Sequence, residues 1–490
     1  MKNIKILTLT LLLIFTFSNC KDFYDVNEPS NVVPDSELSL KLLLPGVEYH
    51  TVMLQFSISY SIGQVQQHIA SYFTQGIDQH YETSINSAWS RYYTKVLYQL
   101  NKMENLAEEK NAVHYKGVVN TLKALSLGMM TDLYGDIPYY EASTGSDNLQ
   151  PAVDSQETLY GEIQDLLDAA IGQFNANDTS GFGVIEGDSF YNGDLDKWIR
   201  LAYTLKARYA MQTLKRNGTQ AAQDALTYLQ NGFTSNDDDL QLSFGDKIKN
   251  PWHTSVVLAS NTGNISVLFS EQLVNYMNSS IYPTAAFDPR IYDYVDNGGA
   301  ATFDGAQNGN AGDTQAGTSA NTLFNADSYY FKQDSPIVLI SYAEALFIKA
   351  EAEFIANGGD ATSTGSSQAA YDAYKDAIQA NMDKIGIDTS LRDAYLNDPA
   401  IDVSAASLKL EHIMKEKYIA LLLNPVIFND LRRYDFSTDV YKGLELPADQ
   451  DPSMNGQWFR RVTFSLSEIE KNIHLWEAYE TRIVPVWWDE

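Results

Sequence analysis

Leu122-Lys-Ala-Leu-Ser-Leu-Gly-Met-Met-Thr-Asp-Leu-Tyr-Gly-Asp-Ile-Pro-Tyr139 is the stretch of sequence that decides the fold. Its apolar residues recur at helical spacing and predict an amphipathic helix: Leu122, Leu125, Met129 and Leu133. Ala124 and Gly128 are small, so a neighbouring helix is able to approach closely. Gly135 and Pro138 are expected to end the helix. The stretch therefore predicts one tightly packed helix followed by a turn.

The same spacing recurs along most of the chain from Leu38 onward. Three further apolar stripes follow it: Leu159, Ile163, Leu166, Leu167, Ala170 and Phe174; Trp198, Leu201, Ala202, Leu205 and Tyr209; Ala343, Leu346, Phe347, Ala350 and Phe354. Residues 371–385 and 408–423 continue the series. Successive helices rich in Ala, Tyr and Leu predict a mainly α fold of tetratricopeptide-like helix pairs. The strict repeat of about 34 residues is absent, so the pairs are expected to be irregular.

Two stretches interrupt the helical pattern, residues 175–192 and residues 297–325. Both are rich in Gly, Asp, Asn and Ser. Long loops inside a compact domain are uncommon and often carry function. The sequence has no low-complexity linker long enough to separate independent domains. We therefore expect a single domain over residues 38–490, with a loop-rich insertion at about residues 276–336.

The amino terminus has the pattern of an exported lipoprotein. Lys2 and Lys5 precede an apolar run at residues 6–17, which is shorter than the about 20 residues that span a bilayer. Residues 1–19 are therefore predicted to be a signal peptide. Cys20 is the sole cysteine, and Ser18-Asn19-Cys20 looks like a lipobox, so Cys20 is the predicted lipidation site and residues 20–37 a leash. The alternative is an ordinary signal peptide with a chance cysteine.

The charge of the chain excludes one class of partner. The formal net charge is −29 at pH 7. Such a chain repels phosphate backbones, so we expect no nucleic-acid partner. Anionic lipid surfaces also repel it, so membrane attachment is expected to depend on the lipid group that is attached at Cys20.

No catalytic, metal or cofactor motif is present. The sequence has no Gly-x-Ser-x-Gly elbow, no phosphate-binding loop with Lys and no His-Glu-x-x-His. His68 and His80 lack metal-ligand spacing, and residues 237–239, three aspartates, are interpreted as a solvated turn rather than a calcium site. Asp132 and Asp136 form a carboxylate pair of the kind that a glycosidase uses. Their place at a helix end predicts instead that Asp136 caps or orders the turn.

Other charged residues are predicted to have structural roles. Asp288 and Arg290 are expected to form a turn with an ion pair. Glu344, Glu351 and Glu353 lie on one predicted helix, largely away from its apolar stripe. They are interpreted as facing solvent or pairing with basic neighbours.

A set of short segments follows one order along nearly the whole chain: Cys20-Lys-Asp-Phe-Tyr-Asp-Val-Asn27, Leu133-Tyr-Gly-Asp-Ile-Pro-Tyr139, Tyr191-Asn-Gly-Asp194, Phe287-Asp-Pro-Arg290, Tyr342-Ala-Glu-Ala-Leu346, Phe428-Asn-Asp-Leu-Arg-Arg433 and Pro485-Val-Trp-Trp-Asp489. In this order they resemble the SusD/RagB family of outer-membrane lipoproteins from Bacteroidetes, and most of all its SusD-like branch. The sequence departs from residues that are frequent in the family at Asn424-Pro425 and at Phe428. These positions lie in a scaffold helix, so the departures concern its local packing.

The resemblance implies a mostly α-helical protein, built on four tetratricopeptide-like helix pairs, with a loop-rich ligand-binding face. It implies a lipid-anchored protein of the cell outer membrane that faces the exterior and caps a SusC-like TonB-dependent transporter. Such a protein binds oligosaccharides or peptides, delivers them to the transporter, and has no catalytic activity and no cofactor. Two alternatives stay open: a surface glycoside hydrolase with an all-α scaffold, and a helical-repeat interaction module without a small ligand.

Candidate ligand-binding residues follow from the chemistry of sugars. Flat aromatic faces cover the C–H sides of sugar rings, and amides, carboxylates or guanidinium groups bond to the hydroxyls. Residues 72–89 and 251–303 are helix-poor and offer both kinds of group. The predicted binding residues are Tyr81, Trp89, Trp252 and Tyr282. For Trp89 the alternative is a core position, because it shares a helix face with Tyr93 and Val96.

Overall fold

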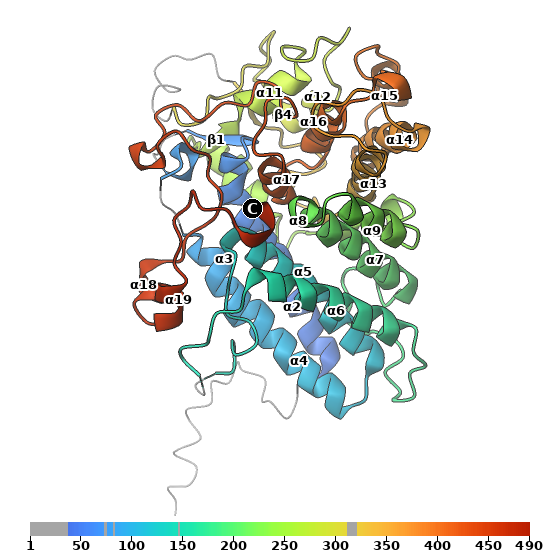
Figure 1. Ribbon diagram of the computed structural model, residues 1–490, viewed down its shortest axis with the longest axis vertical. Coiled ribbons are helices and arrows are strands. Elements are labelled where there is room, and N and C mark those ends of the chain that lie inside the picture. The colour runs from blue at the N-terminus through green and yellow to red at the C-terminus, as the bar shows by residue number, and fades with distance from the viewer. Residues whose placement is uncertain (1–37, 73–75, 82–83, 146–147, 311–320) are drawn as a thin grey trace, which may run out of the picture.

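The computed structural model describes residues 38–490 except 73–75, 82–83, 146–147 and 311–320. Cys20, the predicted signal peptide and the predicted leash lie outside the described residues, as does part of the predicted loop 297–325. The described chain is mostly helical, which confirms the predicted fold class (Figure 1). Across the described part of the chain, no helix combines the length and the apolar character needed to cross a bilayer.

The helices before residue 230 are α2 (Leu40–Val65), α3 (Asn86–Arg91), α4 (Tyr98–Glu109), α5 (Val113–Tyr134), α6 (Gln156–Phe174), α7 (Leu195–Gln212), α8 (Leu214–Asn217) and α9 (Thr219–Leu229). The later helices are α10 (Leu258–Asn261), α11 (Glu271–Met277), α12 (Ile291–Tyr294), α13 (Tyr342–Ala356), α14 (Gln368–Ile385), α15 (Thr389–Leu396), α16 (Leu410–Ala420), α17 (Val426–Arg433), α18 (Leu466–Ile469) and α19 (Ile473–Glu477). Short π-helical segments are η4 (Tyr92–Leu97) and η6 (His253–Val257), and η3 (Ile77–Gln79) is a 3-10 turn.

The strands are short and form antiparallel pairs. These are β1 (Ile69–Ser71) with β3 (Val267–Phe269), β2 (Leu240–Leu242) with β6 (Ile337–Ile340), and β4 (Val295–Asp296) with β5 (Leu323–Phe324). Each pair joins segments that are far apart in the sequence. The strands therefore fix loops to one another rather than forming a layer of their own.

The long helices pack in a row in which each helix contacts the next. α4 packs on α5, α5 on α6, α6 on α7, α7 on α9, α9 on α13, and α13 on α14 and α16. Figure 1 shows this row curving from α4 at the bottom through α6, α7 and α9 to α13 and α14 at the upper right. The loop-rich segments around α11, α12 and β4 lie at the top of the same view. The row has the stacked-helix arrangement that the apolar stripes predict.

Residues 122–134 form the second half of the buried helix α5. A Cβ atom at Gly128 would collide with the ring of Tyr209 in α7, which confirms that this small residue allows a close helix contact. The Tyr209 hydroxyl donates to the Leu125 carbonyl at 3.3 Å. α5 ends as predicted: the Gly135 N–H donates to the Thr131 carbonyl at 2.8 Å, with Gly135 at φ +79°. A positive φ is free of steric cost in glycine.

Asp132 and Asp136 both have structural partners. Asp132 is buried and accepts hydrogen bonds from the Tyr160 hydroxyl, from Trp488 Nε1 at 3.0 Å and from Asn429 Nδ2 at 2.8 Å. Asp136 Oδ1 accepts from the Gln156 N–H at the start of α6 at 2.7 Å, which confirms its predicted role in ordering the turn. The two carboxylates therefore hold helices together, and the hydrolase alternative loses its candidate pair.

The carboxylates of α13 pair with basic residues. Glu344 is fully buried and makes a two-pronged ion pair with Arg208, at 2.6 and 2.7 Å. Glu351 is fully buried and pairs with Arg433 at 2.5 Å and with Lys417 at 3.3 Å. For these two glutamates the solvent-facing interpretation is wrong and the pairing interpretation is confirmed.

Of the aspartates at 237–239, Asp237 is exposed as predicted, but the other two do not lie in a solvated turn. Asp238 and Asp239 are buried, with 2% and 4% exposure. Arg200 binds Asp238 at 2.9 Å, and Lys384 binds Asp239. The prediction of a solvated turn is wrong for these two residues because both of their cationic partners come from other helices.

Glu48 in α2 is a buried carboxyl group next to a second acid. Its Oε2 accepts from the Ser189 N–H at 2.7 Å, and the other acid, Asp188, accepts from Trp198 Nε1 at 2.8 Å. Burial, and then the charge of Asp188, raises the pKa of Glu48 well above its usual value. Folding therefore favours protonated Glu48, and this acid costs stability as the pH rises above its unfolded-state pKa.

Replacing Glu48 by glutamine is expected to stabilise the protein only at high pH. The amide is neutral at every pH and is able to donate a hydrogen bond to Asp188. At about pH 8, Glu48→Gln should raise the free energy of unfolding by about 1–2 kcal/mol, and at about pH 4 it should change little. Urea denaturation at both pH values measures the difference. An equal change at the two pH values would contradict the assignment.

Candidate functional site

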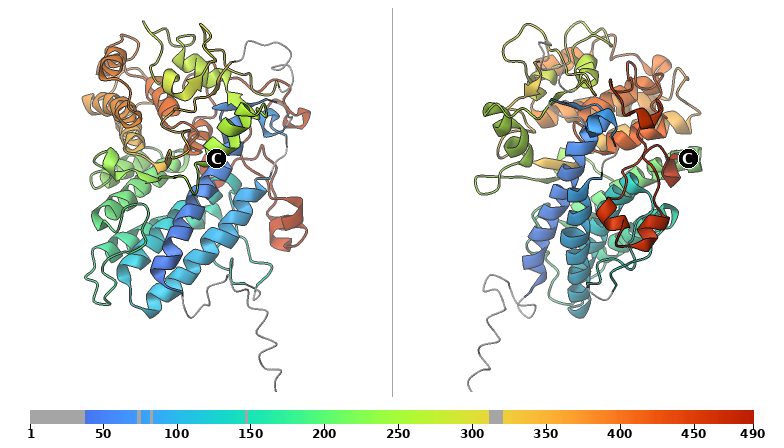
Figure 2. Two further views of the ribbon diagram at one scale, coloured as in Figure 1. Left: turned by 180° about the vertical axis from the view of Figure 1, so that it is seen from behind. Right: turned by 90° about the vertical axis from the view of Figure 1, so that its left-hand side faces the viewer.

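The β1–β3 pair brings together the two helix-poor regions in which ligand-binding residues are predicted. Ile69 pairs with Phe269 and Ser71 with Val267, and the Tyr72 N–H donates to the Ser266 carbonyl at 2.9 Å. In Figure 2, α2 runs from the lower end of the molecule up to this junction. We use the name loop face for the surface formed by residues 60–72, 76–81, 264–275 and 304–310.

Two pockets lie on the loop face, on either side of the β1–β3 pair. One has a volume of about 330 Å³ and is lined by Tyr60, Gln64, Ser71, Asn264, Ser266 and Val267, among others. The other has a volume of about 260 Å³, and its lining includes Gln67, Ser270, Gln272, Asn275, Gln307 and Asn308. Amides and hydroxyls are frequent in both linings, and the second lining also contains Glu271 and Glu445. Side-chain amides donate and accept at once, which matches the hydroxyl groups of a neutral sugar.

Ser266 adds an unusual polar atom to the first pocket. Its hydroxyl oxygen is buried and has no hydrogen-bond partner among the described residues. A buried polar group without a partner is uncommon. Because this oxygen has almost no accessible surface, it would bond to a ligand in the pocket only after a rotation of the side chain. The ring of Tyr60 provides the aromatic wall of the same pocket.

Asp78 fixes the loop at residues 307–310 against the turn η3. It is fully buried and accepts from Asn308 Nδ2 at 2.6 Å and from the Gly309 N–H at 2.7 Å. Burial raises the pKa of Asp78 to about 6. Gln79 Nε2 adds a bond to the Gly309 carbonyl at 2.7 Å. The loop is therefore held in place before any ligand arrives, which reduces the entropic cost of binding.

Tyr81 is the predicted binding residue that presents its ring on the loop face. It is 37% exposed, and its N–H donates to the Gly76 carbonyl at 3.1 Å, which closes the turn that carries it. The Tyr81 side chain is therefore partly accessible to a ligand, although it lines neither of the two pockets.

Trp89 lies on α3, away from the β1–β3 pair. Its ring contacts those of Tyr93, Tyr134 and Phe464, with centroid distances of 4.7, 5.0 and 5.4 Å. Trp89 is half-buried and packs against the main core, in line with the alternative of a core position. Its Nε1 donates to Glu468 Oε2 at 3.3 Å.

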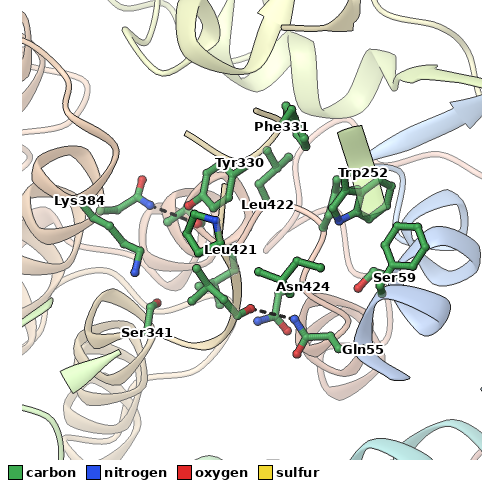
Figure 3. Close-up of a pocket in the computed structure, with 17 residues that line it drawn as sticks. Gln55, Ser59, Trp252, Tyr330, Phe331, Ser341, Lys384, Leu421, Leu422 and Asn424 are labelled. Atoms are coloured by element: carbon green, nitrogen blue, oxygen red, sulfur yellow. Dashed lines mark hydrogen bonds between the residues drawn. The ribbon is translucent and has the colours of Figure 1, made fainter. Parts of the chain in front are cut away.

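Trp252 is buried and offers no ring face to a ligand. It is 5% exposed and lies between Tyr60 and Phe324, with centroid distances of 6.1 and 6.0 Å. Figure 3 shows Trp252 in the interior beside Phe331, Leu422 and Ser59, around a gap of only about 40 Å³. The expectation of a ligand platform at Trp252 does not hold, because η6 and β3 fold this helix-poor region into the core.

Tyr282 is also buried, with 7% exposure. Its ring meets that of Tyr276 at 5.4 Å, and the ammonium groups of Lys415 and Lys442 each lie 5.2 Å from its centroid. Lysines against the ring leave it no free face for a sugar. The expectation that Tyr282 binds a ligand is therefore corrected. Residues 251–303 lack helical periodicity, but Tyr282 is buried all the same.

The residues that the sequence did not single out are the amides. Gln64, Gln67, Asn264 and Asn308 line the pockets but were not selected, because the search started from aromatic rings. Gln64-Val-Gln-Gln67 places three amides at the end of α2, next to a helix-poor region. This run alone does not mark a ligand site, because Gln66 and Gln67 are buried and Gln64 is half-buried.

Comparisons with known proteins agree with the fold. The model of a SusD-like protein family, described as "Starch-binding associating with outer membrane", matches residues 36–446. A search of curated proteins finds no match. A chitin-binding SusD homolog from Flavobacterium johnsoniae is 20% identical with a TM-score of 0.74, and the alignment covers 92% of this chain and 98% of that one.

Two further solved structures are similar. A SusD/RagB family protein from Bacteroides thetaiotaomicron is 21% identical with a TM-score of 0.73, covering 92% of this chain and 99% of that one. A SusD homolog from Bacteroides fragilis is 20% identical with a TM-score of 0.69, covering 91% and 100%. At these identities the structures establish the fold. Because the family match spans most of the sequence, as the ordered segments predicted, this chain belongs to the SusD-like family.

Proposed function

We propose that this protein is a non-enzymatic, lipid-anchored, glycan-binding protein of the outer membrane. It captures a neutral oligosaccharide on the loop face and passes it to a SusC-like TonB-dependent transporter. The observation that carries the proposal is the pair of pockets on the loop face, whose linings contain several amides and hydroxyls and whose loop at residues 307–310 Asp78 holds in place. The description of the family as starch-binding and associated with the outer membrane supports it.

The chemistry of the loop face favours a neutral sugar over a charged one. The ring of Tyr81 covers the C–H side of a pyranose, while Gln64 and Asn264 bond to hydroxyls in the neighbouring pocket. The overall charge of −29 repels acidic polysaccharides at long range. Starch-type and chitin-type oligosaccharides are the first ligands to test, because a structural neighbour is described as chitin-binding.

Substitutions on the loop face are expected to weaken binding without unfolding the protein. Tyr81→Ala and Asn264→Ala each remove one contact, and each should weaken binding about tenfold, the equivalent of ~1.4 kcal/mol. Asn231→Ala, an exposed amide after α9, is the matched control and should bind like the wild type. Isothermal titration with maltohexaose and chitohexaose measures the affinities.

The same titrations separate the alternatives. Release of reducing sugar from either oligosaccharide would support the hydrolase. Absence of both binding and hydrolysis with the two oligosaccharides would contradict glycan capture and favour the interaction module. Unchanged binding by both loop-face variants would place the site elsewhere on the chain.

The anchor and the transporter partner have a test of their own. Cys20→Ser removes the predicted lipid attachment, so in cells that lack the transporter the protein should leave the membrane fraction. The unaltered protein, solubilised in detergent, should copurify with a TonB-dependent barrel. Membrane retention of Cys20→Ser in those cells would argue against the tether, and purification without a barrel would argue against delivery.

A further inference from the structure

A larger pocket lies on another flank of the molecule and shares no lining residue with the pockets of the loop face. It has a volume of about 560 Å³ and is lined by residues of α3, η4 and the start of α4, of the loop after α5, and of the segment that contains α18 and α19. We call it the flank pocket, and its lining includes Trp89, Tyr93, Tyr98, Glu468, Lys471 and Asn472. Its size falls within the range of about 300–1,000 Å³ that is typical of small-molecule sites.

The walls of the flank pocket are fixed by hydrogen bonds. Trp89 Nε1 donates to Glu468 Oε2 at 3.3 Å, which ties α3 to α18 across the pocket. The Tyr93 hydroxyl donates to the Pro138 carbonyl at 2.8 Å. Asn472 Nδ2 donates to the Pro151 carbonyl at 2.9 Å, and this bond holds the start of α19. The rings and the polar groups therefore keep their positions whether or not a ligand is present.

The lining combines aromatic surface with charged and hydroxylic groups. Trp89, Tyr93 and Tyr98 are all half-buried, so part of each side chain remains accessible. Lys471 is exposed at the rim, and Glu468 is half-buried beside the Trp89 ring. Rings next to an ammonium and a carboxylate suit a ligand that has apolar C–H faces and many hydroxyls.

The backbone around the flank pocket argues against a peptide ligand. Part of the lining comes from α3, η4, α4, α18 and α19, and another part from the loop after α5; none of the described lining residues belongs to a strand. An extended peptide is usually bound by adding to a strand edge, and these walls have none to offer. A carbohydrate requires only side chains.

We propose that the flank pocket is a second carbohydrate-binding site, which takes a short pyranose segment of a neutral oligosaccharide. It rests on the proposed function in one respect, since it assumes the same class of ligand. The protein then holds its ligand at two places, the loop face and the flank. A second site on one chain retains a long glycan better than either site alone.

Titration of the full chain with maltohexaose and chitohexaose tests the proposal. At least one of the two sugars should fit two sites on the wild type. Lys471→Ala and Tyr98→Ala should each weaken one of these sites about tenfold or remove it, and leave the site that Tyr81→Ala weakens. Lys249→Ala, an exposed lysine outside both surfaces, is the matched control. Lys471 is exposed, so its variant keeps the test valid if Tyr98→Ala does not fold.

Trp89 provides a readout of its own. Sugar binding in the flank pocket should change the tryptophan fluorescence, and Trp89→Phe should abolish that change while keeping a ring in place. If the titrations show a single binding site whose affinity is unchanged in Lys471→Ala, this inference is overturned and the proposed function stays intact. No binding of either sugar would overturn both, and displacement of the sugar from the flank pocket by a short aromatic peptide would overturn the assignment of the ligand class.

Discussion

Asp132→Ala is expected to lower the free energy of unfolding by about 3–5 kcal/mol. The substitution leaves three buried donors without an acceptor: the Tyr160 hydroxyl, Trp488 Nε1 and Asn429 Nδ2. These donors belong to α6, the carboxyl terminus and α17, so the loss disconnects three parts of the fold at once. Burial already raises the pKa of Asp132, but these hydrogen bonds and the nearby Arg432 oppose that shift.

Denaturation in urea, followed by tryptophan fluorescence, measures the loss. Asp136→Ala is the matched control, because that exposed carboxylate only caps α6 and should cost about 1 kcal/mol. Equal losses at the two positions would contradict the assignment of Asp132 as a structural centre. A stable Asp132→Ala protein that loses a glycosidase activity of the wild type would revive the hydrolase alternative.

Arg290→Met is expected to have an effect of the same size, about 3–5 kcal/mol, because it leaves buried carboxylates with unbalanced charge. Arg290 is fully buried; it pairs with Asp288 at 2.6 Å and with Glu416, and it donates to Asn381 Oδ1 at 3.2 Å. Lys415 remains beside Glu416 in the variant. Asp288 is left without its guanidinium partner.

The pH dependence of this loss identifies its cause. Burial alone would raise the pKa of Glu416, but Lys415 and Arg290 outweigh it and hold the pKa at about 2. The pair therefore stabilises the protein above the unfolded-state pKa of about 4.3, and this stability is lost as the pH falls toward 2. The difference between the wild type and Arg290→Met should accordingly shrink as the pH falls from about 4.3 toward about 2.

A surface arginine provides the control for Arg290. Arg392 pairs with Asp383 and Asp393, whose side chains are 38% and 52% exposed. Arg392→Met should cost less than about 1 kcal/mol, because solvent screens such pairs. A loss at Arg392 as large as that at Arg290 would contradict the importance of burial.

The features that could be predicted from the sequence depend on neighbours along the chain. Helical spacing predicted α5, the small Gly128 predicted its close helix contact, and Gly135 predicted its end. The ion pair between Asp288 and Arg290 spans only two residues and was predicted as well. Local rules of periodicity and turn chemistry are sufficient in such cases.

The features that could not be predicted depend on contacts between distant segments. Asp239 is buried because Lys384, which is far along the chain, reaches it. Trp252 is buried because η6 and β3 place it between rings of α2 and β5. The pocket between Gln64 and Asn264 exists only after β1 pairs with β3. No local pattern records which of these segments will meet.

The position of Trp488 has a consequence for the order in which the protein is made. This residue, next to the end of the chain, is fully buried against Asp132 of α5, and its N–H donates to Gln156 Oε1 of α6 at 3.3 Å. A ribosome delivers the amino-terminal helices first. α5 and α6 therefore lack this indole partner until the segment around Trp488 has emerged, 356 residues after Asp132. This part of the core closes late, after the helices from α7 to α19 have been synthesised.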